Sequence, residues 1–388
     1  MCTTYSLYLI YLVNAFIFSP LFPVESPGIR LFQAYTIPFD SDSIHISTTE
    51  YTDKVSGEIV YQVKSKNYPL YYYSNIKTGV CADDKCRPLD MVLYWNITGR
   101  YLGFALPEEE FLSKYEHKPF SEAEYERLHM LLADSLLPLG NTSFVELIQT
   151  SANQTDENAK VDGVSGATSQ QVLDYVVEGA AYTTHALWNI IYGSSQDLIK
   201  NLTLGNLSNE LLITILQSPD VGDRFWALNH LKRIDQRDSL LQNEVLELIN
   251  DENYSLGVAA LQTIDSTDLC SEAVQISLLE KFYQSNTSLK NLIIDKLKEA
   301  PALCEQVVSK SSDNLSTLDG KLLVSILDLY QVYQIKDKAA MRQVANLLED
   351  ENRYISQKAF KFLNEIETQD SLIQKQLRGY LSETKNQD

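Results

Sequence analysis

Residues 224–234 read RFWALNHLKRI and begin a series of apolar helical segments that decides the fold of the second half of the chain. Related segments recur at intervals of 31, 33, 32 and 35 residues, starting at Ser255, Ser288, Gly320 and Ile355. A second series lies between them, starting near Leu240, Ala273, Cys304 and Ala339. Two alternating helices per unit predict an all-α solenoid, because each pair can bury its apolar face only against neighbouring pairs.

These units resemble divergent HEAT-type repeats. The resemblance implies a C-terminal solenoid of HEAT-like helical pairs, which we expect to cover residues 196–388. Such a stack would offer an extended surface for binding another protein.

The preceding part of the chain, residues 25–195, has a mixed pattern that predicts an α+β domain. Residues 58–63 and 69–73 are rich in aromatic and β-branched side chains, which is typical of strands. Residues 91–95 and 100–104 are two apolar runs joined by Asn96-Ile-Thr-Gly99, and a connection of this length containing glycine predicts a hairpin.

Two helices are expected after the hairpin. Ser121 and Glu124 form a capping-box sequence, followed by Tyr125, Leu128, Leu131 and Leu132 on one face, and this helix should stop before Pro138. The second helix should begin at Ser169 or Gln170, run to Tyr192 and stop at Gly193, because apolar residues recur at the spacing of a buried stripe. We interpret His185 and Trp188 on this helix as packing residues.

One short motif in this region carries chemistry. Residues 162–168 read DGVSGAT, so Asp162, Ser165, Gly166, Ala167 and Thr168 match the pattern D-x-x-[ST]-G-A-[ST]. Gly166 and Ala167 leave the backbone open to the approach of another enzyme. A threonine hydroxyl such as that of Thr168 is a poor nucleophile unless another group activates it. A phosphate on Thr168 would face the N-terminus of the expected helix, which favours an anion.

The motif resembles the acceptor of the FMN-binding domain family, which includes flavin subunits of the sodium-pumping NADH:quinone reductase and related electron-transfer complexes. Residues 80–86, 94–95, 117–120 and 182–188 also resemble bacterial proteins that carry the same motif, so the likeness covers residues 56–195. It implies an FMN-binding-like α+β domain with FMN attached covalently to Thr168 as a phosphoester. It further implies a Mg-dependent flavin transferase that uses FAD as the donor.

Composition limits the other function classes. The 388 residues include 32 Lys and Arg against 52 Asp and Glu, a formal charge of −20, so nucleic-acid binding is not expected. No Ser-His-Asp order, metal-binding His pair or phosphate loop is visible in the sequence. His117 precedes a Lys-Pro pair, and we leave open whether it is structural or lies beside the flavin ring.

The N-terminus and the cysteines bear on whether the chain is exported from the cytoplasm. Residues 7–24 are almost entirely apolar, which favours a signal peptide over residues 1–24. A buried N-terminal element or a misplaced start codon are the alternatives, since no Lys or Arg precedes Arg30. Cys81 and Cys86 are close enough for a disulfide, and two inert thiols or a redox pair remain open.

Together these features predict an exported, periplasmic or extracytoplasmic flavoprotein that passes electrons between partners. The tether would keep FMN from being lost outside the cytoplasm, and the cofactor would supply the chemistry. The redox partner is not identified by the sequence, and it could belong to a membrane-associated complex. The alternative is a scaffold without flavin that binds proteins through its helical repeats.

Overall fold

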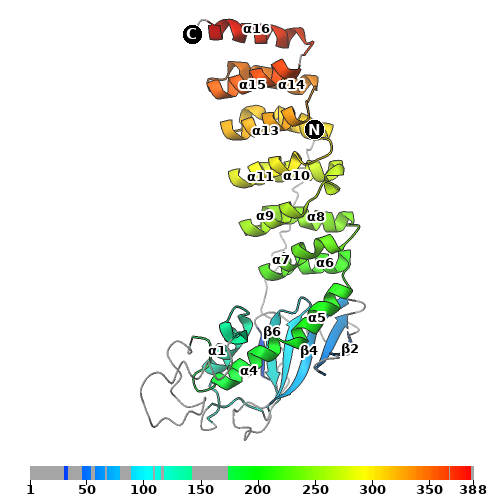
Figure 1. The fold of residues 1–388 in the computed structure, drawn as a ribbon, viewed down its shortest axis with the longest axis vertical. Helices are drawn as coiled ribbons and strands as arrows, with labels where there is room; N and C mark the ends of the chain where they lie inside the picture. Colours follow the sequence, from blue (N-terminus) through cyan, green and yellow to red (C-terminus); the bar gives the residue numbers. More distant parts are fainter. Residues whose placement is uncertain are drawn as a thin grey trace, which may run out of the picture. The chain divides into compact units, whose positions relative to one another are not determined.

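The computed structural model divides the chain into two compact units, Met1–Leu202 and Thr203–Asp388 (Figure 1). The division lies inside the helix α5 (Ser194–Gly205). The first unit is α+β, and the second is built of helices packed in pairs. The structure describes residues 30–33, 46–53, 57–65, 68–78, 89–107, 110–114, 118–141, 174–366 and 368–385.

An antiparallel sheet is the centre of the first unit. Within the described residues it has six strands in the order β1-β6-β5-β4-β3-β2. The strands are β1 (Arg30–Gln33), β2 (Ile46–Thr52), β3 (Ile59–Ser65), β4 (Tyr68–Thr78), β5 (Leu89–Asn96) and β6 (Tyr101–Leu106). The strands expected over residues 58–63 and 69–73 are therefore confirmed as parts of β3 and β4.

The predicted hairpin is confirmed as the β5–β6 pair. Its turn is closed by the Asn96 side chain, whose Oδ1 accepts hydrogen bonds from the backbone N–H groups of Thr98 and Arg100 at 3.0 and 2.7 Å. Gly99 has a φ of +83°, a conformation that glycine adopts at little cost. The turn therefore links β5 directly to β6, and the pairing of the two strands shifts register between Tyr94 and Trp95.

Helices cover one face of this sheet. Alternate residues of β5 are buried, including Met91, Leu93 and Trp95. Figure 1 shows α4 (Ala181–Ile191) and the start of α5 lying across a face of the sheet. Helix α1 (Glu122–Ala133) packs on β6 and α4, and the short 3₁₀ helix η2 (Pro138–Gly140) follows it.

Helix α1 forms where the sequence predicts it. Glu124 accepts a hydrogen bond from the Ser121 backbone N–H at 2.8 Å, which completes the expected capping box. The helix ends at Ala133, before Pro138, and buries Tyr125, Leu128, Leu131 and Leu132. The apolar stripe found in the sequence is thus its core-facing side.

The second unit consists of two layers of helices. Helices two apart in the sequence pack on one another, so the even-numbered helices form one layer and the odd-numbered helices the other, stacked from α6 to α16 in Figure 1. One layer contains α6 (Asn209–Leu216), α8 (Ser239–Glu247), α10 (Glu272–Gln284), α12 (Glu305–Asp313), α14 (Lys338–Asn346) and α16 (Ser371–Lys385). The other contains α7 (Val221–His230), α9 (Tyr254–Thr263), α11 (Thr287–Leu297), α13 (Gly320–Val332) and α15 (Arg353–Ile366). Both predicted helical series are confirmed.

The helix starts reveal a constant repeat of 33 residues. In one layer the residues preceding the helices are Asp220, Asn253, Asn286, Asp319 and Asn352, and each side chain accepts from a backbone N–H of the first turn. The corresponding residues of the other layer are Asp238, Ser271, Cys304, Asp337 and Asp370. Both sets advance by 33 residues. The uneven intervals of 31 to 35 residues arise because apolar runs start at different points of each helix.

Candidate functional site

The predicted acceptor residues Asp162–Thr168 lie outside the described residues, as do Cys81, Cys86, His117 and the apolar segment 7–24. The structure does describe the chain on both sides of the motif, up to Asn141 and again from Asp174. These two flanks define where the motif-bearing segment is attached.

The upstream flank is held by α4. Leu139 is fully buried, and its carbonyl accepts a hydrogen bond from the Asn189 side chain at 3.4 Å. Gly140 lies directly against the Trp188 ring, since a Cβ atom at this position would be 2.8 Å from a ring carbon. A larger residue at Gly140 would therefore force either Gly140 or the Trp188 ring to shift.

The downstream flank is held by α1 and by a turn before α4. The carbonyl of Asp174 accepts a hydrogen bond from Arg127 Nη2 at 2.7 Å. Val177 is buried, and its backbone N–H donates to the Thr184 hydroxyl at 3.2 Å. Gly179 follows with a φ of +75°, close to the Lys114 side chain.

The expected helix from Ser169 or Gln170 to Tyr192 is wrong over residues 174–180, which form turns, and helix α4 begins only at Ala181. Gly179 interrupts the helical path because its backbone is left-handed. Val176 and Val177 are both buried although they lie in a turn. Their apolar side chains therefore fit the pattern that was assigned from the sequence to the buried side of a helix. The C-terminal part of the prediction is confirmed, since α4 ends at Ile191 with Tyr192 as its cap.

Helices α1 and α4 form one support for both flanks. The Trp188 indole N–H donates to the Asp134 carbonyl at 2.9 Å, and the Tyr192 hydroxyl donates to the Leu132 carbonyl at the same distance. Trp188 is buried as well, which confirms its interpretation as a packing residue. The segment carrying the motif is thus attached at both ends to a single packed pair of helices.

A buried polar pair connects β6 to α1, and it was not identified from the sequence. His129 Nδ1 is 3.1 Å from the Tyr101 hydroxyl, and both residues are buried. Burial lowers the pKa of the His129 imidazole, and burial together with Tyr192 raises the pKa of Tyr101 well above its ordinary value. Tyr101 therefore stays protonated, and it shares a hydrogen bond with His129 Nδ1 in which the imidazole tautomer decides the donor. Among the described residues, His129 Nε2 has no hydrogen-bond partner.

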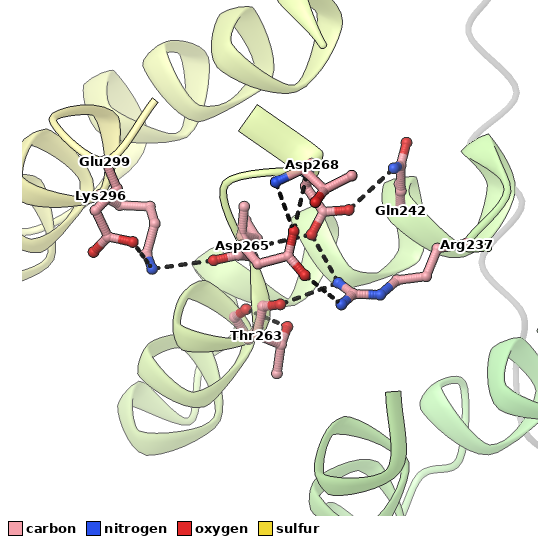
Figure 2. A network of polar contacts seen from close by, with 10 residues as sticks. Arg237, Gln242, Thr263, Asp265, Asp268, Lys296 and Glu299 are labelled. Carbon is pink, nitrogen blue, oxygen red and sulfur yellow. Dashed lines mark hydrogen bonds and ion pairs between the residues drawn. The ribbon is translucent and has the colours of Figure 1, made fainter. Parts of the chain in front are cut away.

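A polar network around Arg237 connects neighbouring repeats of the second unit. Arg237 donates to Asp268 at 2.7 Å, to Asp265 at 3.0 Å and to the carbonyl of Thr263 at 3.0 Å, and Gln242 also donates to Asp268 (Figure 2). The network joins the connection before α8 to the connection after α9. Because Arg237 pairs with both carboxylates, the cluster stabilises neighbouring repeats.

Other candidate features are few within the described residues. They contain no group of three His, Cys, Asp or Glu side chains arranged to hold a metal ion. Cys270 is an exposed free thiol and Cys304 a buried one. No helix in the described ranges has the length and apolar character needed to cross a membrane.

The chain matches no protein-family model and no curated protein.

Proposed function

We propose that this chain is an exported flavoprotein that carries FMN covalently on Thr168 and passes electrons between redox partners. The motif Asp162–Thr168 carries the proposal, since all of its fixed positions fit the acceptor of the FMN-binding domain family. When bound, FMN supplies one- and two-electron transfer, while the protein determines where the flavin is held.

Attachment would be a phosphoryl transfer catalysed by a separate Mg-dependent flavin transferase. The Thr168 hydroxyl oxygen forms a bond to the FMN phosphorus of FAD, the bond to the AMP portion breaks, and the hydroxyl proton is released. No electrons are exchanged in this step. Asp162, Ser165, Gly166 and Ala167 would present the acceptor to the transferase, with the small residues leaving room for its approach.

The anchored flanks support this role. A transferase must reach Thr168, whereas a redox partner needs the flavin at a reproducible position. Contacts of the two flanks with α1 and α4 support the second requirement, because they fix where the motif-bearing segment is attached.

The two units would then have separate tasks. We propose that the first unit is an FMN-binding-like domain and that the second is a HEAT-like solenoid that binds the redox partner or a membrane-associated complex. The boundary proposed from the sequence lies at residues 195 and 196, and residues 1–24 would be a signal peptide directing the chain to the periplasm. Oxidation of Cys81 and Cys86 to a disulfide would fit that compartment.

The alternative function is a protein-binding scaffold without flavin. The observation favouring it is the regular two-layered stack of the second unit, which would bind a partner whether or not Thr168 is modified. Flavin content separates the two functions.

Intact-mass analysis after co-expression with a flavin transferase tests the proposal. We expect an FMN-sized mass increase and a flavin absorption band that survives denaturation. Thr168→Ala should abolish both, whereas the neighbouring Ser169→Ala should retain them. A colourless wild-type protein, or flavin that persists in Thr168→Ala, would contradict the assignment.

A further inference from the structure

The last helical pair exposes an apolar position that every preceding repeat buries. Leu381 of α16 is 45% exposed. The residues at the same place in the 33-residue repeat are Ile249, Phe282, Leu315 and Leu348, which are 0, 0, 1 and 6% exposed. In those repeats the following helical pair helps to cover the position. Leu381 thus lies on a face that has the character of a repeat interior.

Two further apolar positions are buried in the earlier repeats and more exposed in the last helical pair. Phe360 of α15 is half-buried, whereas its equivalents Leu228, Leu261, Ile294 and Leu327 are at most 3% exposed. The Phe360 ring stacks on Tyr380 of α16, with ring centroids 5.1 Å apart. Leu377 is also half-buried, while Val245, Leu278 and Val344 at the same place are nearly inaccessible. An apolar strip therefore runs over both helices of the last pair.

Positive charge borders this strip. Arg378 is exposed at a position where Leu246, Leu279 and Ala345 are buried. Lys375 is exposed one turn before it, and among the described residues neither side chain has an ion-pair partner. Lys361 of α15 is exposed too, with Glu365 at 3.9 Å. In a chain of formal charge −20, the exposed cations Lys375 and Arg378 thus lie beside the apolar strip of α16.

We infer that this face, called here the terminal face and made of Phe360, Leu377, Leu381, Lys375 and Arg378, docks an acidic amphipathic helix of a partner protein. A helix is the occupant because helices cover the equivalent positions in the other repeats. It should be acidic because Lys375 and Arg378 have no ion-pair partner among the described residues. A second copy docked by a two-fold axis would bring these same cations together, which is unfavourable.

The inference is independent of flavin attachment, and fluorescence anisotropy with the full chain tests it. The probe is a labelled peptide of three copies of the heptad Glu-Leu-Glu-Glu-Leu-Leu-Glu, and its counterpart has Lys in place of each Glu. Net charge alone would favour the basic peptide, because the protein is strongly acidic. We expect saturable binding of the acidic peptide that is at least about fivefold tighter than binding of the basic one.

Substitutions locate the binding. Leu381→Ser and the double variant Lys375→Gln/Arg378→Gln should each weaken binding at least about fivefold. Matched controls are Leu240→Ser, at a leucine that is 66% exposed on α8, and the exposed basic pair Lys232→Gln/Arg233→Gln. The controls should bind as the wild type does, and circular dichroism confirms folding of all variants.

Three outcomes would overturn the inference. The first is equal or tighter binding of the basic peptide, and the second is binding that the terminal-face substitutions leave unchanged. The third is self-association in sedimentation equilibrium that Leu381→Ser abolishes, because a second copy would then be the occupant. Loss of flavin in Thr168→Ala affects none of these measurements, so failure of the docking inference and failure of the flavin proposal are distinguishable.

Discussion

The indole N–H of Trp95 donates a hydrogen bond to the main-chain carbonyl of Ile191 across 3.0 Å in the interior of the first unit. Trp95 lies on the central strand β5 and Ile191 is the last residue of α4. The same helix carries Trp188, against which Gly140 packs. The position of α4 on the sheet therefore determines where the motif-bearing segment is attached.

Replacing the Trp95 indole should weaken the packing of α4 on the sheet. Trp95→Phe removes ring volume from a fully buried site and leaves the Ile191 carbonyl without its indole donor. We expect a loss of about 1–3 kcal/mol in the free energy of unfolding of the first unit. Native-state hydrogen exchange of the β5 and α4 amides measures it. Trp226→Phe, in the second unit, should leave this exchange unchanged, and an unchanged rate in Trp95→Phe itself would refute the prediction.

The buried pair of Tyr101 and His129 predicts a pH dependence. Burial lowers the pKa of His129 in the folded state, so the unfolded chain binds the proton more tightly. The stabilisation is fully present above the unfolded pKa of about 6.5 and is lost as the pH falls below it.

Stability of the first unit, measured by urea unfolding at several pH values, should therefore fall between about pH 7 and pH 5. His129→Gln keeps a polar side chain near Tyr101 but cannot titrate, so it should flatten this slope. His230→Gln, in the second unit, serves as the control and should keep it. A slope that survives in His129→Gln would mean that another group is responsible.

The helical repeats could be predicted from the sequence because a local signal specifies them. Apolar residues recur at helical spacing within each segment, and the segments themselves recur, so neither step depends on contacts between distant residues. The hairpin was predictable for the same reason, since Asn96 and Gly99 close it within a few residues. Constant spacing of the helix caps was also present in the sequence, at Asp220, Asn253 and their successors.

Prediction from the sequence was wrong or incomplete in two situations. In one, a local pattern fits both a helix and a turn, and in the other, the feature depends on contacts between residues distant in the sequence. Val176 and Val177 fit a helical stripe, and only Gly179 and the Thr184 hydroxyl decide for a turn. The pairing of Tyr101 with His129 depends on α1 packing on β6, which no local pattern encodes. The exposure of Leu381 likewise cannot be predicted from the sequence of α16 alone, because it depends on which other residues cover that helix.

The network around Arg237 predicts a strong effect of breaking a nearly buried ion pair. The Arg237 and Asp268 side chains are 11 and 9% exposed. Arg237→Met leaves Asp268 with Gln242 as its remaining side-chain donor in the network, so we expect the second unit to lose about 2–4 kcal/mol. Thermal unfolding followed by helical circular dichroism checks this value.

A matched control separates this pair from ordinary surface charges. Lys310 and Glu280 also join neighbouring repeats, but their side chains are 49 and 57% exposed. Lys310→Met should therefore cost less than about 1 kcal/mol. Equal losses in the two variants would show that burial does not determine the strength of these inter-repeat contacts.

The last prediction concerns where the first unit ends. Gln196 of α5 donates to the Gly99 carbonyl at 2.8 Å, and the Ser194 and Ser195 hydroxyls donate to Glu58 at 2.7 and 2.6 Å. Ile199 is fully buried as well. A fragment ending at Ser195 lacks the Gln196 contact and the Ile199 side chain, whereas a fragment ending at Gly205 keeps both.

We therefore expect the fragment ending at Gly205 to unfold cooperatively and the one ending at Ser195 to be less stable by about 2–5 kcal/mol, as expected for loss of a buried isoleucine and a buried hydrogen bond. Urea unfolding of the two fragments, with Ile199→Ala in the longer one as an intermediate case, measures the difference. If both fragments were equally stable, α5 would contribute nothing to the first unit, and the boundary after residue 195 would be the correct one. If the longer fragment were the more stable, the shorter one should also accept less FMN on Thr168, because α4 would lose the helix that follows it.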